Sequence, residues 1–442
     1  MSSLLKANFQ TTLPMAAHAR GVFIYDSSGK DYLDGSGGAM TVSIGHGVKE
    51  VLDVMRVQAE KVCFTYRAQF SNQPAEDLAD ALTALAPGDL NHAFFVNSGS
   101  EGTELAMRIA IAYWRDRGRP TKTHILGRHI SYHGMTMGAL SMSGHEARRQ
   151  DYSDLLHPFA LAPAPYAYRS ELPPDAYARS IVERWDAVIQ ECGPDRVAAV
   201  IVEPVVGAAG GALTPPPGYL KALQDICRKH DVLLIADEVI TGMGRCGAWF
   251  ACEHDDVTPD MIVTAKGMSS GYTPMGAVLL RQPIVQAMAQ GSGIGPFGHT
   301  FSGNPLSAAV CLAVVNYMRQ HKILDNVHER GTQLEQGLRA LSQRYAWLAD
   351  VRGKGLLWGF EFVTDAQRRT PPPAALKANE RFAAHCRDAG LIVYPAGIAP
   401  YNNAAIVAPP LVISESEVRT LLQRLEAGMR AFAQEFGLDI PT

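Results

Sequence analysis

The amino-acid sequence predicts an α/β protein built around a mostly parallel sheet. In the middle of the chain, short uninterrupted apolar runs alternate with segments that have helical spacing. Such runs are typical of strands buried on both faces, and their alternation with helices favours a parallel sheet covered on both sides. The strands are predicted at His92–Val96, Thr123–Arg128, Val197–Val202, Val232–Ala236, Met261–Ala265 and Gly276–Leu280.

Helices are predicted between these strands and at the end of the chain. In the segment Thr103–Trp114, Leu105, Ile109 and Ala112 recur at helical spacing, and Tyr219–Lys229 is predicted as a second helix. Near the end of the chain, a serine and a glutamate at 414 and 417 form a capping box, which predicts a last helix through residue 432.

The two ends of the chain have a different pattern from the middle. Gly21–Asp34 alternates like a hairpin, and short β runs occur late in the chain at Gly355–Val363, Leu391–Tyr394 and Ala404–Ile413. We therefore predict a large α/β domain over residues 51–320. A smaller α+β domain would be built from both ends, residues 1–50 and 321–442.

Composition excludes several classes of protein. The chain has 442 residues, of which 47% are hydrophobic and 19% are charged, so a large core is expected and disorder is not. The formal net charge of −4 gives no electrostatic footprint for nucleic acid or for an anionic membrane. No run approaches the roughly 20 apolar residues of a membrane span, and the N-terminus lacks the pattern of a signal peptide.

The cysteines point to a reducing compartment. Their number, seven, is odd, and they are scattered without any C-x-x-C pair. We interpret them as buried thiols and expect neither a disulfide framework nor a metal site. The expected protein is thus soluble and cytoplasmic, with no nucleic-acid or membrane partner.

Conspicuous residues stand where four of the predicted strands end. In open α/β sheets, ligands bind beyond the carboxyl ends of the strands. These residues are Gly99 with Ser100, Glu203, Asp237 and Lys266. A further candidate, Tyr132, follows the predicted strand that ends at residue 128.

Each of these residues has a functional and an ordinary structural interpretation. The loop that contains Gly99 and Ser100 opens a helix, so its backbone N–H groups could bind phosphate or simply form an N-cap. Asp237 follows five apolar residues; it needs a cationic partner, or it is a helix N-cap or a metal ligand. Burial would lower the pKa of Lys266 and free its amine for carbonyl chemistry, unless the side chain extends to water. Tyr132 is either a stacking platform or a core tyrosine.

The combination favours the functional interpretations. A phosphate cradle, an aromatic side chain, an acid and a lysine at successive strand ends are what pyridoxal 5′-phosphate (PLP) requires. The phosphate is held at the helix start, the lysine forms a Schiff base, and the acid pairs with the pyridine nitrogen.

Six stretches of the chain match a known family. They are NSGSEGTELAMRIA (97–110), SYHGMTMGALSMSG (131–144), IVEPVVGAAGG (201–211), LLIADEVITGMGRCG (233–247), PDMIVTAKGMSSGYTPMGAV (259–278) and HTFSGNPLSAA (299–309). Through them the chain resembles the class III (omega-type) aminotransferases, which are PLP enzymes of fold type I. The resemblance runs from about Gly21 to near the C-terminus. It implies a seven-stranded, mostly parallel sheet in the large domain.

The resemblance also implies roles for individual residues. Lys266 would bind PLP as a Schiff base, and Asp237 would pair with its pyridine nitrogen. Glu203 would steady the hydrogen bonds around the cofactor. The other cofactor-binding positions it implies are Gly99 and Ser100 at the phosphate, Tyr132 and Val239 against the two ring faces, His133, and Thr300 reaching the phosphate of a neighbouring subunit.

The activity that the resemblance implies is transamination. An amine or omega-amino acid would donate its amino group to an oxo acid such as pyruvate, in a ping-pong mechanism with aldimine and pyridoxamine forms of the cofactor. The resemblance also implies a homodimer with shared active sites, or a tetramer.

The chain departs from the family pattern in the substrate pocket. Where amine-accepting members commonly have a tryptophan, this chain has Met40, and where they commonly have an arginine for the acceptor carboxylate, it has Tyr394. A buried carboxylate needs another cation, so Arg67 is our candidate for the replacement. Its alternative is a surface arginine. We expect Met40 and Tyr66 to shape a donor pocket that is more adaptable than one with a rigid indole.

Other functions remain as alternatives. Decarboxylases, racemases and aminomutases use the same cofactor and scaffold. A dinucleotide oxidoreductase would need G-x-G-x-x-G directly after a strand, and the glycines from Gly242 to Gly247 do not have that spacing. A non-catalytic PLP sensor would not need the complete set of acid, lysine and phosphate site.

Overall fold

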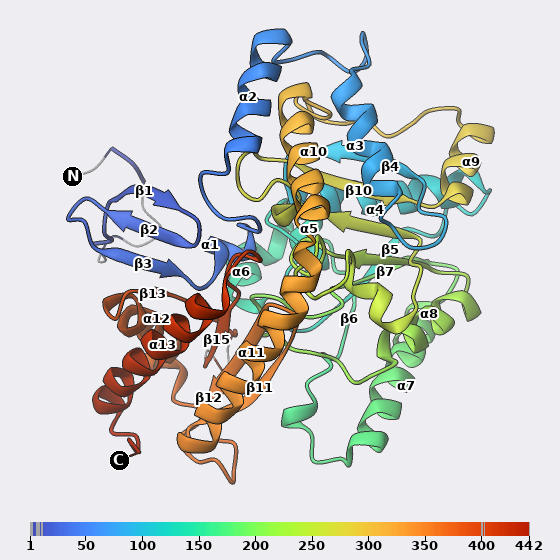
Figure 1. Ribbon diagram of the computed structural model, residues 1–442. Coiled ribbons are helices and arrows are strands. Elements are labelled where there is room, and N and C mark those ends of the chain that lie inside the picture. The colour runs from blue at the N-terminus through green and yellow to red at the C-terminus, as the bar shows by residue number, and fades with distance from the viewer. Residues whose placement is uncertain (1–2, 6–8, 10–11, 399–400, 402, 442) are drawn as a thin grey trace.

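A seven-stranded sheet forms the centre of the protein. The computed structural model describes residues 3–5, 9, 12–398, 401 and 403–441 (Figure 1). The strands lie in the order β4-β10-β9-β8-β7-β5-β6, and β10 runs antiparallel to both of its neighbours whereas the others pair in parallel. The strands are β4 (His92–Val96), β5 (His124–Arg128), β6 (Leu161–Ala162), β7 (Val197–Val202), β8 (Leu233–Asp237), β9 (Met261–Thr264) and β10 (Gly276–Leu280). The predicted mostly parallel sheet is confirmed, and β6 is an additional short strand.

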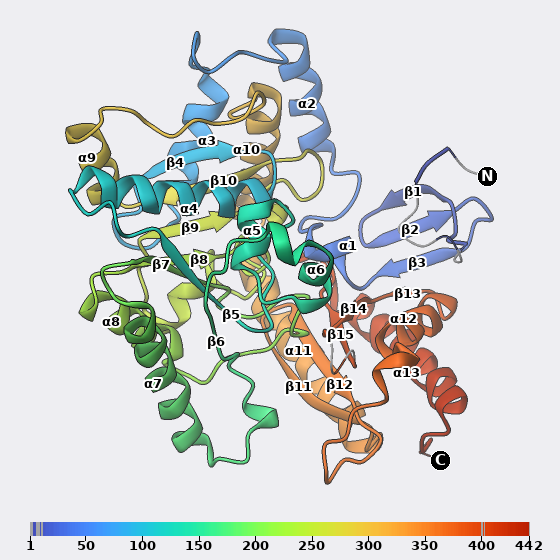
Figure 2. The ribbon, with the colours of Figure 1, turned by 180° about the vertical axis from the view of Figure 1, so that it is seen from behind.

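Alternate residues of each central strand face two different layers of helices. In β7, Val200 and Val202 join a core with α3 (Gln73–Thr83), α7 (Pro174–Cys192), α8 (Tyr219–Lys229) and α10 (Pro305–Gln320). Ile201 joins the opposite core, with α4 (Gly99–Asp116) and α9 (Gln282–Gln290). The two views show α10 on one side of the sheet and α4 on the other (Figures 1 and 2). Burial on both faces explains why the strands are uninterrupted apolar runs.

Strands from both ends of the chain share a second sheet. The predicted hairpin is confirmed as β2 (Phe23–Asp26) and β3 (Asp31–Asp34), with β1 (Ala16–Arg20) beside β2. The late strand β13 (Leu391–Ile392) pairs in parallel with β3, so the C-terminal part closes against the N-terminal part. The division into domains at residues 51 and 320 stays a prediction.

A third sheet lies in the C-terminal part. Its order is β11-β12-β15-β14, made of β11 (Leu348–Lys354), β12 (Leu357–Phe362), β15 (Ala404–Val407) and β14 (Tyr394–Ala396). The strand predicted to reach Ile413 ends at Val407 because two prolines follow it, at 409 and 410, and proline cannot donate a hydrogen bond to the ladder.

Further helices complete the fold. The capping box is confirmed: the Ser414 hydroxyl accepts from the N–H of Glu417, the Glu417 carboxylate accepts from that of Ser414, and the helix runs four residues beyond the predicted end. The remaining helices are α1 (Gly37–Met40), α2 (Lys49–Lys61), α5 (Met137–Met142), α6 (Glu146–Arg149), α11 (Ile323–Arg344), α12 (Ala378–Asp388) and α13 (Glu415–Phe436). Among the described residues, no helix combines the length and apolar character needed to cross a membrane.

The expectation that all cysteines are buried is wrong for two of them. Cys63 is exposed just after α2, and Cys192, at the end of α7, is half-buried. The other five cysteines are buried, and all seven are free thiols.

Candidate active site

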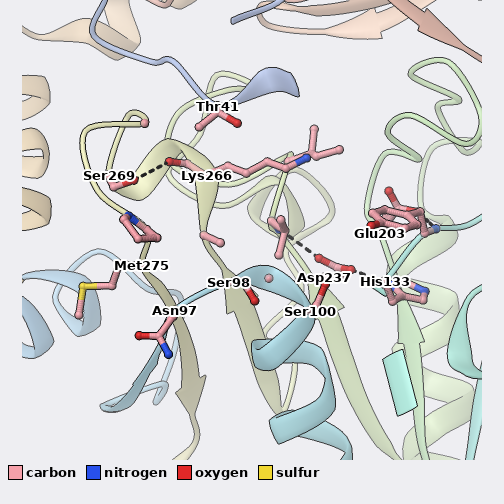
Figure 3. A pocket seen from close by; sticks show the side chains of 18 of the residues that line it. Thr41, Asn97, Ser98, Ser100, His133, Glu203, Asp237, Lys266, Ser269 and Met275 are labelled. Atoms are coloured by element: carbon pink, nitrogen blue, oxygen red, sulfur yellow. Dashed lines mark hydrogen bonds and ion pairs between the residues drawn. The ribbon is translucent and has the colours of Figure 1, made fainter. Parts of the chain in front are cut away.

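The residues predicted at the strand ends line one cavity of about 500 Å³. It lies beyond the carboxyl ends of β7, β8 and β9, next to the start of α4 (Figure 3). Eight predicted site residues line it, namely Gly99, Ser100, Tyr132, His133, Glu203, Asp237, Val239 and Lys266. The cavity is therefore where strand-end geometry predicts a ligand.

The start of α4 presents hydrogen-bond donors to the cavity. Ser98 caps the helix, since its hydroxyl accepts from the Glu101 N–H at 3.2 Å. The N–H groups of Gly99 and Ser100 have no hydrogen-bond partner in the part of the chain that the structure describes. Unpaired N–H groups and the positive end of a helix dipole favour an anion. The segment is thus an N-cap and an anion cradle together.

Gly134 makes room for this cradle. Its φ is +135°, and a Cβ at this position would lie 2.5 Å from the Ser100 hydroxyl oxygen. The same hydroxyl accepts from the Met135 N–H at 3.1 Å, which fixes the turn against the helix start. The close approach therefore needs glycine.

Gly134→Ala is expected to weaken phosphate binding about 10-fold or more, because the added methyl displaces Ser100 or bends the turn away from the helix start. Titration of apoprotein with PLP, followed by absorbance, measures this. Gly118→Ala, in a left-handed turn with open space around its Cβ, is the control for backbone strain alone. Equal affinity in both variants would contradict a phosphate site at Ser100.

Asp237 is the last residue of β8 and is buried. One carboxylate oxygen lies 2.7 Å from Nδ1 of His133, and the other accepts from the Val239 N–H at 3.1 Å. The second ring nitrogen of His133 is buried without a hydrogen-bond partner. No group of three or more His, Cys, Asp or Glu side chains that could hold a metal occurs among the described residues. The carboxylate is held at the cavity wall by two donors, as a partner for a cationic ring nitrogen would be.

Lys266 follows β9 and extends along the cavity (Figure 3). Burial lowers the pKa of its ammonium to about 8; Asp237 and Glu203 oppose the shift, and Arg148 adds to it. The lowered pKa and the position in the cavity favour the functional interpretation of Lys266 over a lysine that extends to water. Near pH 8, Lys266 is therefore a neutral amine in a large fraction of the molecules, and the neutral amine is the form that attacks a carbonyl carbon.

Glu203 organises the loops around the cavity. It follows β7 and is buried; one carboxylate oxygen accepts from the Tyr132 N–H at 3.1 Å and the other from the Gly207 N–H at 2.8 Å. Burial raises its pKa, and His133 and Arg128 oppose that shift. The side chain thus fixes the backbone that carries Tyr132.

The remaining predicted residues do not line this cavity. Met40 is buried beside Ile240, a cavity residue, and Tyr394 packs against the same cluster. Arg67 is exposed; its guanidinium donates to the carbonyl of Pro296 at 3.1 Å. Two further positions are exposed, Tyr66 and Thr300. The roles of these residues stay predictions.

The sequence analysis did not predict much of the cavity wall that faces the residues from β7 and β8. This wall comes from the loop that leads into β10. Because β10 is antiparallel to its neighbours, its start, not its end, lies at the carboxyl edge of the sheet. The motif YTPMG before β10 was the available signal. The missed lining residues are Thr41, Asn97, Ser98, Gly134, Ile240, Ala265, Ser269, Gly271, Thr273, Pro274 and Met275.

Comparison with known proteins decides the family. A family model described as "Aminotransferase class-III" matches residues 5–429. The chain belongs to the class III aminotransferases. It is 41% identical to the uncharacterized aminotransferase YodT of Bacillus subtilis over 95% of this chain and 96% of that protein. It is 34% identical to the putrescine–pyruvate aminotransferase of Pseudomonas aeruginosa over 91% and 88%.

A solved structure agrees with the family. The PLP-bound amine transaminase from an uncultivated Pseudomonas species superposes with a TM-score of 0.92 at 32% identity, over 98% of both chains. The fold is therefore that of the fold type I transaminases, and the aminotransferase is PLP-dependent. The predicted family, fold class, activity and cofactor are confirmed. The residues present fit PLP: the unpaired N–H groups could bind its phosphate, the buried carboxylate could pair with its ring nitrogen, and the partly neutral lysine could react with its carbonyl group.

Proposed function

We propose that the cavity at the sheet edge is the transamination site. The observation that supports this most is that Lys266 and Asp237 line the same cavity and that the pKa of Lys266 is lowered there. Lys266 would bind PLP covalently, Asp237 would pair with the pyridine nitrogen, and Gly99 and Ser100 would hold the phosphate. Tyr132 and Val239 would contact the ring.

When bound, PLP supplies an electron sink for the bond that breaks at the substrate carbon. The protein's own groups then manage protons and charge. Asp237, buried and held by two donors, keeps a negative charge where a protonated ring nitrogen needs one. As a neutral amine, Lys266 Nζ takes the proton from the carbon that bears the substrate's amino group and holds it for return. Glu203 and His133 keep the surrounding loops and the carboxylate in place.

The proposed substrates are an amine or omega-amino acid as donor and an oxo acid such as pyruvate as acceptor. A relative named as a putrescine–pyruvate aminotransferase supports this pair. The cavity supports it as well, because most of the surface that its lining atoms expose is apolar, and this suits the carbon skeleton of an amine.

A panel of donors and acceptors tests the function. With an amine and pyruvate, we expect alanine to accumulate, and the cofactor spectrum to alternate between its two forms as donor and acceptor are added in turn. Release of carbon dioxide, racemised donor or a rearranged amine, without alanine, would instead identify a decarboxylase, a racemase or an aminomutase.

We propose further that the protein works as a cytoplasmic homodimer. Large apolar side chains are exposed on two adjacent segments near Thr300, including Phe70, Phe297 and Phe301, and the Phe301 ring packs against Phe64 at 5.7 Å. Exposed apolar area of this kind is typical of an interface. We propose that a second copy of this chain covers this surface. The predicted contact of Thr300 with the phosphate of a neighbouring subunit also requires a second copy.

Phe297→Asp is expected to convert the dimer to a monomer, because it buries a charge in an apolar contact. Sedimentation velocity measures the mass in solution. Leu172→Asp, at an exposed leucine in another segment of the chain, is the control and should leave the mass unchanged. A monomeric unmodified protein would contradict the proposal.

A further inference from the structure

Arg148 lies beside the Tyr132 side chain at the cavity and has no place in the chemistry described so far. The guanidinium carbon of Arg148, in the short helix α6, lies 4.4 Å from the centre of the Tyr132 ring. Tyr132 lines the cavity. Arg148 is half-buried and has no ion-pair partner among the described residues. A guanidinium that lacks a carboxylate partner in a partly buried position is available for one from a ligand.

The segment that carries Arg148 is held firmly. The next residue, Arg149, donates from a single guanidinium nitrogen to the carbonyls of Leu140, Ser141 and Ser143, at 2.9, 2.9 and 2.7 Å. These bonds attach α6 to the end of α5. The guanidinium of Arg149 therefore binds backbone carbonyls, whereas the guanidinium of Arg148 lies above the ring of Tyr132.

The neighbouring groups leave the charge of Arg148 uncompensated. Asp237 faces His133, and Glu203 accepts from backbone N–H groups. The ring of His145 lies 6.1 Å from that of Tyr132, and burial with Arg148 lowers the pKa of His145 to about 4, so it is neutral at pH 7. The field of Arg148 reaches Lys266, where it favours the neutral amine.

The acceptor of the proposed reaction carries a carboxylate beside its carbonyl group. Placing that carboxylate in the cavity without a cation would be costly. Asp237 and Glu203 are anions, Lys266 reacts with the carbonyl, and no arginine lines the cavity among the described residues. Arg67, the candidate from the sequence, is turned toward Pro296 and lies over the Phe94 ring at 4.9 Å.

We propose that Arg148 binds the carboxylate of the oxo acid acceptor and determines the preference of the enzyme for acidic acceptors. The planar guanidinium offers two parallel N–H donors to a carboxylate, and its contact with the ring of Tyr132 holds it next to a residue that lines the cavity. Binding forms no covalent bond and transfers no proton. An uncharged aldehyde acceptor has no carboxylate for Arg148 to bind. The inference rests on the proposed function, because it needs an oxo acid as substrate.

The test follows the acceptor half of the reaction in the holoenzyme. Enzyme converted to its pyridoxamine form with an amine is mixed with pyruvate or with butanal, and the return of the original spectrum is recorded. In Arg148→Gln, the pyruvate concentration for half-maximal rate is expected to rise about 10- to 100-fold, with that for butanal unchanged. Arg148→Lys, which keeps the charge but not the fork, should recover part of the loss. Arg179→Gln, an exposed arginine on α7, is the matched control for the loss of one positive charge.

Three results would overturn the proposal. The first is an unchanged response to pyruvate in Arg148→Gln. The second is an equal loss with butanal, which would mean that Arg148 only supports Tyr132. The third is a rise for pyruvate in Arg67→Gln but not in Arg148→Gln. Failure of the proposed function is distinct, because the unmodified enzyme would then transfer no amino group to pyruvate.

Discussion

Lys266→Ala is expected to abolish amino transfer and to remove the visible absorbance of covalently bound PLP. The variant lacks the only lysine that lines the cavity among the described residues, and with it both the proposed attachment point and the proposed base. The methyl side chain leaves space and buries no charge, so we expect the fold to be kept. Steady-state transamination with an amine and pyruvate, with absorbance of the dialysed protein, measures both effects. Retained turnover would refute the assignment.

A second lysine provides the control for this result. Burial also lowers the pKa of Lys122 to about 8, but its ammonium donates to the carbonyls of Val197 and Asp231 at the other end of the sheet. A low pKa alone would therefore not separate the two lysines. Borohydride reduction of the holoenzyme, followed by peptide mass spectrometry, should find the cofactor on Lys266 and not on Lys122. In apoprotein, labelling of Lys266 by a carbonyl reagent should rise with pH to half its maximum near pH 8, since the neutral amine is the reactive form.

Strand ends account for the part of the site that could be predicted from sequence. Continuous apolar runs located β7, β8 and β9, and the residue after or at the end of each run was Glu203, Asp237 or Lys266. Parallel strands bring their carboxyl ends to one edge of the sheet, so the strand pattern in the sequence predicts that these three residues lie close together. The same patterns located the helix start that carries Gly99 and Ser100.

The rest depended on information that these patterns do not contain. An apolar run does not show its direction, so the reversal of β10, which brings Thr273 and Met275 to the cavity, was not foreseen. Arg148 lies 16 residues after Tyr132 in a short helix, and only tertiary packing places it over the ring. The sequence position of Arg67 predicts a place in the substrate pocket, but its guanidinium donates to the carbonyl of Pro296. Long polar side chains have many rotamers, and their direction is decided by neighbours that are distant in sequence.

Asp237→Asn is expected to lower the rate of transamination about 100- to 1000-fold. The substitution removes a negative charge from the side chain that we propose pairs with the ring nitrogen. Opposite charges about 4 Å apart attract by roughly 4 kcal/mol at an effective dielectric constant of 20, and each 1.36 kcal/mol of lost transition-state stabilisation is about a factor of ten. Single-turnover spectroscopy of each half-reaction measures the loss. We expect both halves to slow, because each needs the same electron sink.

The hydrogen bonds of Asp237 decide how the loss should be interpreted. The carboxylate accepts at one oxygen from the Val239 N–H and at the other lies 2.7 Å from His133 Nδ1. Asparagine has one carbonyl oxygen, so when Nδ1 carries the proton one of the two donors faces an NH₂ group. This mismatch should lower the free energy of unfolding by about 1–3 kcal/mol, which thermal unfolding of the apoprotein measures. His133→Asn removes the same contact but keeps the Asp237 charge. A small loss of rate in His133→Asn beside a large one in Asp237→Asn would therefore assign the effect to the charge. A near-normal rate in Asp237→Asn would mean that another group pairs with the ring nitrogen.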